Sequence, residues 1–203
     1  MKITQMIMDK KNTNKIHIYV DGEYFVDLDA EVVFSLGLKK EEELDIVTLD
    51  KMQEKQKSVQ CYNKSLALLS KNLKTKKQLK DYLYQKGFTT PVIEECILRL
   101  EKIGFIDDDR YAKMFIESKK SYKGKNAIVS TLISKGIPRE IIDNNMKDFT
   151  SSSDVIKSLE KKYMKNKTYD AKNIVKLKRY LLSKGFMYEE INRVIGDYNE
   201  DRD

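Results

Sequence analysis

Three consecutive carboxylates, Asp107, Asp108 and Asp109, stand in the stretch GFIDDDRYAKMF. Clustered carboxylates can hold a divalent cation or exchange protons in acid–base catalysis. Either chemistry needs further ligands, or a nucleophile and base, at a useful spacing, and the sequence offers no such set. A helix start explains the stretch as well: Asp107 is placed as the N-cap, and the next two carboxylates fall in the first turn, where the helix dipole favours negative charge.

The neighbours of these carboxylates also have structural explanations. Gly104 is placed to close the preceding helix in the left-handed conformation, and Phe105 follows it. Ile106 and Tyr111 have the spacing of a hydrophobic staple around the cap. We therefore expect Tyr111 to lie in the core and Arg110 to be exposed.

Few other residues could carry catalysis or bind metal. Cys61 and Cys96 lie in unrelated contexts without CxxC spacing, which predicts two reduced thiols in a cytoplasmic protein, with Cys96 in the core of a helix. The single histidine, His17, lies far from both in the sequence, so we expect no zinc site and no cofactor. We interpret His17 as a solvated strand residue and do not expect an enzyme.

Length and composition are those of a folded protein. The chain has 203 residues, 40% of them apolar, which is enough for a core. Its apolar runs are far shorter than a membrane span, and the N-terminus lacks the pattern of a signal peptide. We expect a monomer in the cytoplasm.

Charge is distributed unevenly along the chain. Residues 1–57 carry 9 Lys and Arg against 12 Asp and Glu, whereas residues 58–203 carry 30 against 20. The basic part fits a polyanion or an acidic groove on another protein, although a lysine-rich surface that only confers solubility would look the same. Only 6 of the 39 basic residues are arginines, which argues against specific reading of bases.

The N-terminal segment reads as a small β module. KIHIYVDGEYFVDL contains two alternating runs joined by Asp21-Gly22, a pair that suits a type I′ turn. Residues 3–8 could add a third strand, and AEVVFSLG predicts a short helix that ends at Gly37. An isolated hairpin is marginal in water, so we expect this module to pack against another element.

From about residue 58 the chain has helical spacing and an internal repeat. A Lys-Gly pair occurs at residues 86–87, 135–136 and 184–185, each 49 residues after the last. Apolar residues keep the same frame, for example Leu83, Leu132 and Leu181. Each repeat has room for three helices, and the glycine is placed to end the second. Pro91 and Pro138 are placed at the first residue of the third.

These patterns predict a mainly α protein of three tandem three-helix repeats of about 49 residues. A row of such units would be elongated and curved. We expect the small β-hairpin module over residues 1–57, and the repeats over residues 58–106, 107–150 and 151–203.

GFIDDDRYAKMF resembles the signature of the RecX regulatory family, in which a Gly-aromatic-x-Asp-Asp-x-x-Tyr-Ala segment begins the first helix of the middle repeat. The matching residues here are Gly104, Phe105, Asp107, Asp108, Tyr111 and Ala112. The preceding ALLSKNLKTKKQLKDYLYQKGFTTPVIEECILRLEKI and the following GKNAIVSTLISKGIPREIID are similar to the family's first and second repeats. The resemblance covers about residues 58–203. The first repeat departs from the family in having lysines where arginines are common, and only part of the family has the hairpin module.

The resemblance implies a non-enzymatic regulator of DNA repair, recombination and the SOS response. Proteins of this family bind the RecA recombinase and its filament on single-stranded DNA. They lie along the helical groove of the filament and modulate its ATPase, strand-exchange and coprotease activities, usually by inhibition. Whether the chain also binds single- or double-stranded DNA by itself stays open, and we expect no membrane partner.

Candidate partner-binding residues are Arg110 and three lysine clusters near the junction of the first and second helices of the repeats. The clusters are Lys71, Lys74, Lys76 and Lys77; Lys119, Lys120, Lys123 and Lys125; and Lys161, Lys162, Lys165, Lys167 and Lys172. Lys74, Lys123 and Lys172 keep the 49-residue frame. Such groups could meet a repeating acidic or phosphate lattice, or they could simply be solvated lysines at exposed junctions.

Two other functions stay open at this point. Paired helices joined by a glycine turn are also what a helix-turn-helix protein offers to DNA or RNA. The helices after the turns are acidic or mixed, which argues against recognition helices. An adaptor for an unrelated filament or groove is the other alternative.

Overall fold

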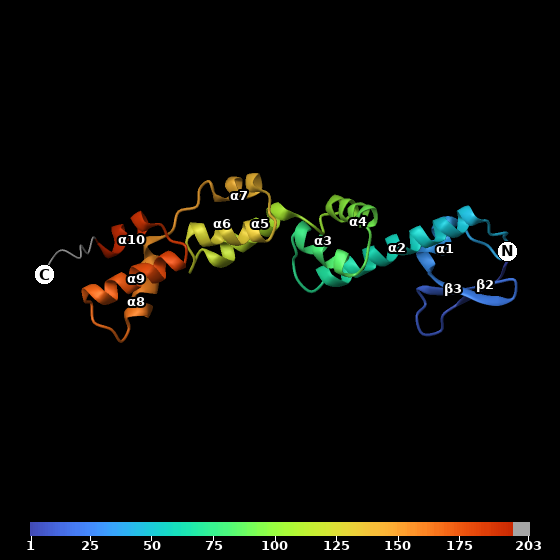
Figure 1. The fold of residues 1–203 in the computed structure, drawn as a ribbon, viewed down its shortest axis with the longest axis horizontal. Helices are drawn as coiled ribbons and strands as arrows, with labels where there is room; N and C mark the ends of the chain where they lie inside the picture. The colour runs from blue at the N-terminus through green and yellow to red at the C-terminus, as the bar shows by residue number, and fades with distance from the viewer. Residues whose placement is uncertain (197–203) are drawn as a thin grey trace. The chain divides into compact units, whose positions relative to one another are not determined.

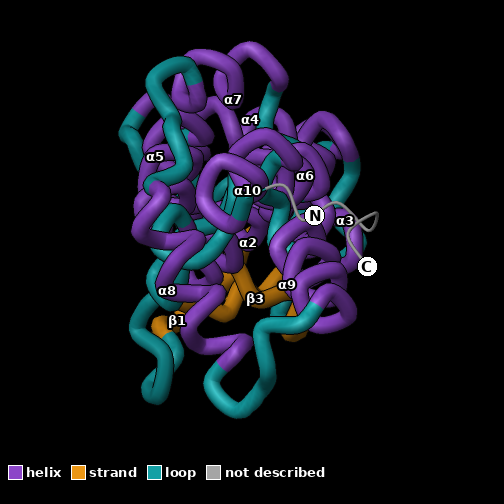
Figure 2. Tube along the Cα trace, turned by 90° about the vertical axis from the view of Figure 1, so that its left-hand side faces the viewer, coloured by secondary structure: helices purple, strands orange, loops and turns teal. Residues whose placement is uncertain are grey.

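Alternating apolar residues at the N-terminus form the three-stranded antiparallel sheet that the sequence predicts. The computed structural model describes residues 1–196 (Figure 1). Strands β1 (Ile3–Met8), β2 (Lys15–Val20) and β3 (Glu23–Asp29) follow one another in the order β1-β2-β3. Figure 2 shows them together in orange. The expected third strand is therefore β1.

The hairpin between β2 and β3 is closed by the predicted turn. Asp21 and Gly22 have φ angles of 49° and 92°, the positive values of a type I′ turn. Ile16, Ile18 and Val20 are buried on one face of β2, where they form a core with residues of α1 and α2. The period of two thus places one face of the sheet against helices, as expected for an antiparallel sheet with one solvated side.

Helix α1 (Ala30–Leu36) ends at Gly37, whose φ of 65° is left-handed, as predicted. Helix α2 (Ile46–Leu69) begins well before residue 58, where the sequence placed the start of helical spacing. Asp45 caps it by accepting a hydrogen bond from the Thr48 amide at 2.8 Å. The early start was missed because only isolated residues of its first half, such as Met52, face the core among many polar ones. The module therefore packs on the helix that also opens the first repeat.

Ten helices lie within the described residues, and the last nine form three groups of three. The first group is α2, α3 (Lys76–Gln85) and α4 (Thr90–Lys102). The second group comprises α5 (Asp108–Lys119), α6 (Lys125–Ser134) and α7 (Arg139–Met146). The third comprises α8 (Ser153–Met164), α9 (Ala171–Ser183) and α10 (Tyr188–Ile195). The mainly α fold with three-helix repeats is confirmed.

The 49-residue frame marks the buried positions of all three groups. Nine residues that share three positions of the frame are fully buried: Leu79, Ile128 and Leu177; Leu83, Leu132 and Leu181; and Ile93, Ile142 and Ile191. Each burial of such a side chain is worth about 1.5–3 kcal/mol relative to exposure. The sequence repeat is therefore a repeat of cores.

The Lys-Gly pairs close the second helix of each group. Gly87, Gly136 and Gly185 have φ angles of 82°, 80° and 89°. In each case the amide of the following residue returns to a carbonyl five positions earlier, for example from Phe88 to Leu83 at 3.3 Å. The prolines stand close to the predicted place but not at it: Pro91 is the second residue of α4, and Pro138 is the N-cap of α7.

The chain divides into two compact units. One contains Met1–Leu73 and Leu79–Phe105, and the other contains Lys74–Gln78 and the chain from Ile106 onward. The first turn of α3 thus belongs with the second unit. The predicted boundary after residue 57 falls inside α2, and the segment 151–203 extends beyond the described residues, so the four-segment division stays a prediction. No helix within residues 1–196 is long and apolar enough to cross a membrane.

Candidate binding surface at the repeat junctions

The lysine clusters lie where the sequence placed them, between the first and second helices of each group. Lys71 and Lys74 are in the loop after α2, and Lys76 and Lys77 open α3. Lys119 ends α5, Lys120 is its C-cap, Lys123 is in the loop, and Lys125 opens α6. Lys161 and Lys162 lie in the last turn of α8, Lys165 is its C-cap, Lys167 follows, and Lys172 is the second residue of α9. Their placement is observed, and their binding role stays a prediction.

Some of these lysines have partners within the fold. The Lys120 ammonium lies 2.7 Å from Glu117, and both side chains are more than half exposed, so the ion pair is worth little. The Lys167 nitrogen lies 3.3 Å from the centre of the Tyr163 ring, a cation–π contact. Both lysines remain exposed on the surface despite these contacts.

Junction loops dock onto the Lys-Gly turn of the following repeat. Thr75 is buried and caps α3: its hydroxyl accepts a hydrogen bond from the Gln78 amide at 3.1 Å and donates one to the Lys135 carbonyl at 2.7 Å. One repeat later the Gly124 amide donates to the Lys184 carbonyl at 3.0 Å. Donor and acceptor both advance by 49 residues, so the docking contact itself is periodic.

Close packing accompanies this hydrogen bond. A Cβ on Gly136 would overlap the aliphatic chain of Lys77, and a Cβ on Gly185 would overlap Ala127. A Cβ on Gly124 would overlap the backbone at Gly185. The stem of Lys77 is therefore part of the docking contact, although the sequence offered Lys77 only as a partner-binding residue.

Docking fixes the positions of two lysines of the 49-residue frame. Lys74 immediately precedes Thr75, and Lys123 immediately precedes Gly124. Both are half-buried, as expected for lysines beside a packed loop. Lys172, the third of the frame, is exposed on α9. The second unit thus carries basic groups at repeating positions on a hydrogen-bonded backbone.

The three carboxylates of the opening motif each have a structural partner in the second unit. Asp107 is the N-cap of α5 and accepts from the Arg110 amide at 2.9 Å, as predicted. Asp108 accepts from the Lys76 amide at 2.9 Å. Asp109 accepts from Asn145 at 2.7 Å and pairs with Lys113, whose hydrogen bond is the main cause that lowers the pKa of this carboxyl.

The rest of the motif completes the start of α5. Gly104 has a φ of 72°, and Phe105 donates to the Leu100 carbonyl at 2.9 Å, which closes α4 as expected. Ala112 is fully buried, and Tyr111 is half-buried against the core of α5–α7. Arg110 is exposed. Within residues 1–196 no group of three His, Cys, Asp or Glu side chains is arranged to hold a metal ion.

His17 is a partly exposed residue of strand β2, as predicted, but its side chain has partners that the sequence did not indicate. Its Nδ1 lies 2.6 Å from Asp27, and its Nε2 lies 3.2 Å from Asp9. The hydrogen bond to Asp27 is the main cause that raises the pKa of His17, and burial opposes it. A register shift between Ile18 and Tyr19 places His17 opposite Asp27, where an unbroken hairpin would place Val26.

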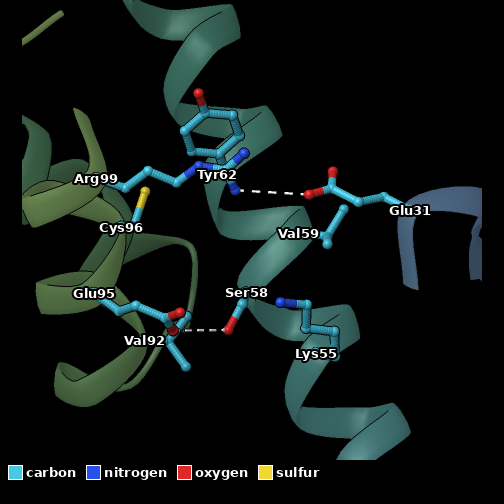
Figure 3. Close-up of a pocket in the computed structure, with 9 residues that line it drawn as sticks. All are labelled: Glu31, Lys55, Ser58, Val59, Tyr62, Val92, Glu95, Cys96 and Arg99. Atoms are coloured by element: carbon cyan, nitrogen blue, oxygen red, sulfur yellow. Dashed lines mark hydrogen bonds and ion pairs between the residues drawn. The ribbon is translucent and has the colours of Figure 1, made fainter. Parts of the chain in front are cut away.

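The two cysteines are neighbours, which corrects the expectation of unrelated contexts. Cys61 on α2 and Cys96 on α4 are both buried, and each thiol is the largest influence on the ionisation of the other. Cys96 is in the core of a helix, as predicted, and borders a small cavity (Figure 3). Sequence spacing gave no signal of this pair, because the contact depends on how α2 packs against α4.

Comparison with known proteins matches four consecutive parts of this architecture. Residues 1–45 match the model of the regulatory protein RecX N-terminal domain. Residues 61–100, 107–144 and 155–195 match the first, second and third three-helix domains of RecX. The chain belongs to the RecX family of regulatory proteins. This membership confirms the predicted resemblance and extends it to the N-terminal module, which the sequence left without a secure assignment.

Curated relatives named regulatory protein RecX align with nearly the whole chain. The chain is 32% identical over 200 residues to the regulatory protein RecX of Clostridium perfringens, and 35% identical over 200 residues to that of Clostridium beijerinckii. Each alignment covers 96% of this chain and 94% of the relative. A crystal structure of regulatory protein RecX has the same fold, with a TM-score of 0.80 at 23% identity over 97% of this chain and 99% of that one. RecX from Lactobacillus salivarius matches with a TM-score of 0.62 at 27% identity over 68% of this chain and 94% of its own.

Proposed function

We propose that this chain is a monomeric, cytoplasmic, non-enzymatic regulator that binds the RecA recombinase and its filament on single-stranded DNA. By binding, it inhibits the ATPase, strand-exchange and coprotease activities of the filament and so takes part in DNA repair and the SOS response. Membership of the RecX family supports the regulatory role. The finer activities rest on the family resemblance that the motif around Asp107 first indicated.

One structural observation supports filament binding in particular. Lys74 and Lys123 precede the two residues that dock onto successive Lys-Gly turns, so the loops that carry them are anchored at equivalent positions of the repeat. A filament is a lattice of identical subunits. Basic groups held at repeating positions can contact equivalent sites on successive subunits without rearranging. Contacts that each contribute little then add along the length of the chain.

The character of the charge favours the same partner. These basic groups are lysines, which suit diffuse contacts with carboxylates and phosphates better than the reading of base edges. No second function needs to be invoked for the carboxylates of the motif, since each has a partner within the fold.

The ATPase rate of RecA on single-stranded DNA, titrated with the purified chain at moderate salt, tests the proposal. We expect the rate to fall at substoichiometric amounts of the chain. The fall should persist when single-stranded DNA is in excess. Under that condition the chain cannot lower the rate merely by sequestering the DNA. A fall that excess DNA abolishes would indicate a nucleic-acid-binding protein instead, and no change would refute the regulatory role on RecA.

Charge-reversal variants test the surface. The variant K74E/K123E/K172E removes the three lysines of the frame, and K51E/K64E/K157E makes the same change of net charge at exposed lysines outside it. We expect the first to weaken inhibition at least about tenfold and the second to have little effect, because a lattice contact depends on position as well as charge. Equal weakening by both variants would show that net charge alone acts.

A further inference from the structure

Cys61 and Cys96 come together in the packing of α2 against α4. Cys61 and Ser65 are one turn apart on α2 and therefore share a face. The Ser65 hydroxyl donates to the Cys61 carbonyl at 2.8 Å and lies 3.4 Å from the Cys96 sulfur. All three side chains are small and buried, and each thiol is the largest influence on the pKa of the other.

The two sulfurs differ in access. Cys61 is 0% exposed, whereas Cys96 is 5% exposed and borders a cavity of about 30 Å³. A single water molecule needs about 10–15 Å³, so the cavity has room for a molecule the size of hydrogen peroxide. A small oxidant can therefore meet Cys96 first.

Polar groups surround the cavity on three elements. Glu31 comes from α1 and Lys55 from α2, while Glu95 and Arg99 come from α4 (Figure 3). The Arg99 guanidinium lies over the Tyr62 ring at 3.8 Å and pairs with Glu31 at 3.7 Å, which holds it beside the cavity.

The surroundings of the two thiols also shift their pKa values in opposite directions. The hydrogen bond from Cys61, the contact with Ser65 and the charge of Arg99 lower the pKa of Cys96 to about 7, against burial and the charge of Glu95. The same thiol–thiol hydrogen bond, together with burial, raises the pKa of Cys61. Because the thiolate is the nucleophile, Cys96 is the more reactive of the pair.

We propose that Cys61 and Cys96 form an oxidation-sensitive dithiol, in which a hydroperoxide oxidises Cys96 and Cys61 converts the product into a disulfide between α2 and α4. In the first step the Cys96 sulfur attacks a peroxide oxygen, so that an S–O bond forms and the O–O bond breaks. The other oxygen leaves as an alcohol, or as water from hydrogen peroxide, with the proton that the thiol lost.

In the second step the Cys61 sulfur attacks the sulfur of the Cys96 sulfenic acid. The S–S bond forms, the S–O bond breaks, and water leaves with the proton of Cys61. Overall the two thiols lose two electrons and two protons, and the peroxide gains them. The chemistry of this pair does not depend on which partner the chain binds.

Peptide mapping of the full chain after treatment with hydrogen peroxide tests the proposal. The native protein is oxidised, remaining thiols are alkylated in denaturant, and the digest is analysed without reductant. We expect a linked peptide pair containing Cys61 and Cys96, loss of both thiols in parallel, and recovery of both on reduction. Retention of both thiols, or disulfides only between molecules, would overturn the proposal.

Single variants assign the two roles. In Cys61→Ser we expect Cys96 to stop at the sulfenic acid, which a 1,3-diketone such as dimedone traps. In Cys96→Ser we expect Cys61 to stay reduced at the same dose of peroxide. Oxidation of Cys61 at the native rate in the second variant would refute the order of the steps. Circular dichroism checks that the variants fold, and Cys61→Ala and Cys96→Ala replace any that do not.

Two measurements on the native sequence are independent of any variant. In denaturant the thiols are separated by 34 residues of flexible chain, so we expect the disulfide to form at least about tenfold more slowly than in the folded protein. Equal rates would show that the fold does not prearrange the pair. The disulfide should also raise the Tm by about 5 °C, because it constrains the unfolded chain, and a lower Tm would show that the helices do not accommodate it.

Discussion

The Lys-Gly turn of the first repeat differs from those of the second and third, although the three look alike in the sequence. A Cβ on Gly87 would meet no atom within 4 Å, whereas one on Gly136 or Gly185 would overlap a neighbouring repeat. All three glycines have positive φ angles. The first is thus required by backbone conformation alone, and the other two by conformation and by docking. The glycine of the Lys-Gly pair therefore has one structural role in the first repeat and two in the second and third.

Among substitutions of the three Lys-Gly glycines, we expect the largest loss of stability at Gly185, which is the most crowded. In Gly185→Ala the new methyl group meets both the backbone and the side chain of Ala127, and alanine is strained at a φ of 89°. Overpacking costs about 1–3 kcal/mol and the left-handed conformation about 1–2 kcal/mol, so we expect a loss of about 3 kcal/mol in the free energy of unfolding. Urea denaturation followed by circular dichroism measures it. A loss below about 1 kcal/mol would mean that α6 moves aside freely.

A smaller effect is expected where the neighbour is a long side chain. In Gly136→Ala the strain of the backbone is similar, but the methyl group meets only the stem of Lys77. We expect a loss of about 2 kcal/mol in the same urea experiment. Adding Lys77→Ala removes part of the crowding, so the double variant should lose less than the sum of the single losses. Strict additivity would show that Lys77 does not press on this turn.

The hydrogen bond of the docking contact can be removed by itself. Thr75→Ala deletes the hydroxyl that caps α3 and that binds the Lys135 carbonyl. A lost cap costs about 1 kcal/mol and a lost hydrogen bond a similar amount, so we expect a loss of about 2 kcal/mol in urea denaturation. Thr75→Ser keeps the hydroxyl and serves as the control. Equal losses in the two variants would assign the effect to the methyl group of Thr75.

The smallest effect is expected at the undocked turn. Gly87→Ala brings only the cost of a left-handed alanine, about 1 kcal/mol, because the space around it is open. Thermal denaturation of this variant beside Gly136→Ala and Gly185→Ala ranks the three turns directly. A loss as large as that of Gly185→Ala would contradict the distinction between docked and undocked glycines.

The cores of the repeats could be predicted from the sequence because burial repeats with residue type. Leu83, Leu132 and Leu181 share one frame position, and all are fully buried. The same was true of the cap at Asp107, since capping depends on residues within one turn of chain. Local chemistry and periodic hydrophobicity thus carried most of the fold.

The docking contacts could not be predicted, because chemically different groups perform the same role. A side-chain hydroxyl binds the turn in one repeat, and a backbone amide binds it in the next. Thr75 and Gly124 occupy equivalent positions of the repeat, but their residue types are not similar. The sequence also concealed the partners of His17, since one irregular register step in the hairpin decides that Asp27 faces it. Contacts that depend on packing or on a single irregularity produce no periodic pattern in the sequence from which they could be predicted.

The third repeat uses its docking position differently, and this limits how the array can be lengthened. Asn173 occupies the place that Thr75 and Gly124 hold in the frame, but α9 begins earlier, and the Asn173 amide donates to Asp170 at 2.8 Å. The group that would receive another repeat is therefore already satisfied by the cap of its own helix. A protein engineer who appended a further copy of the second repeat would first have to shorten α9 and replace Asp170, because the Asn173 amide is already used by that cap.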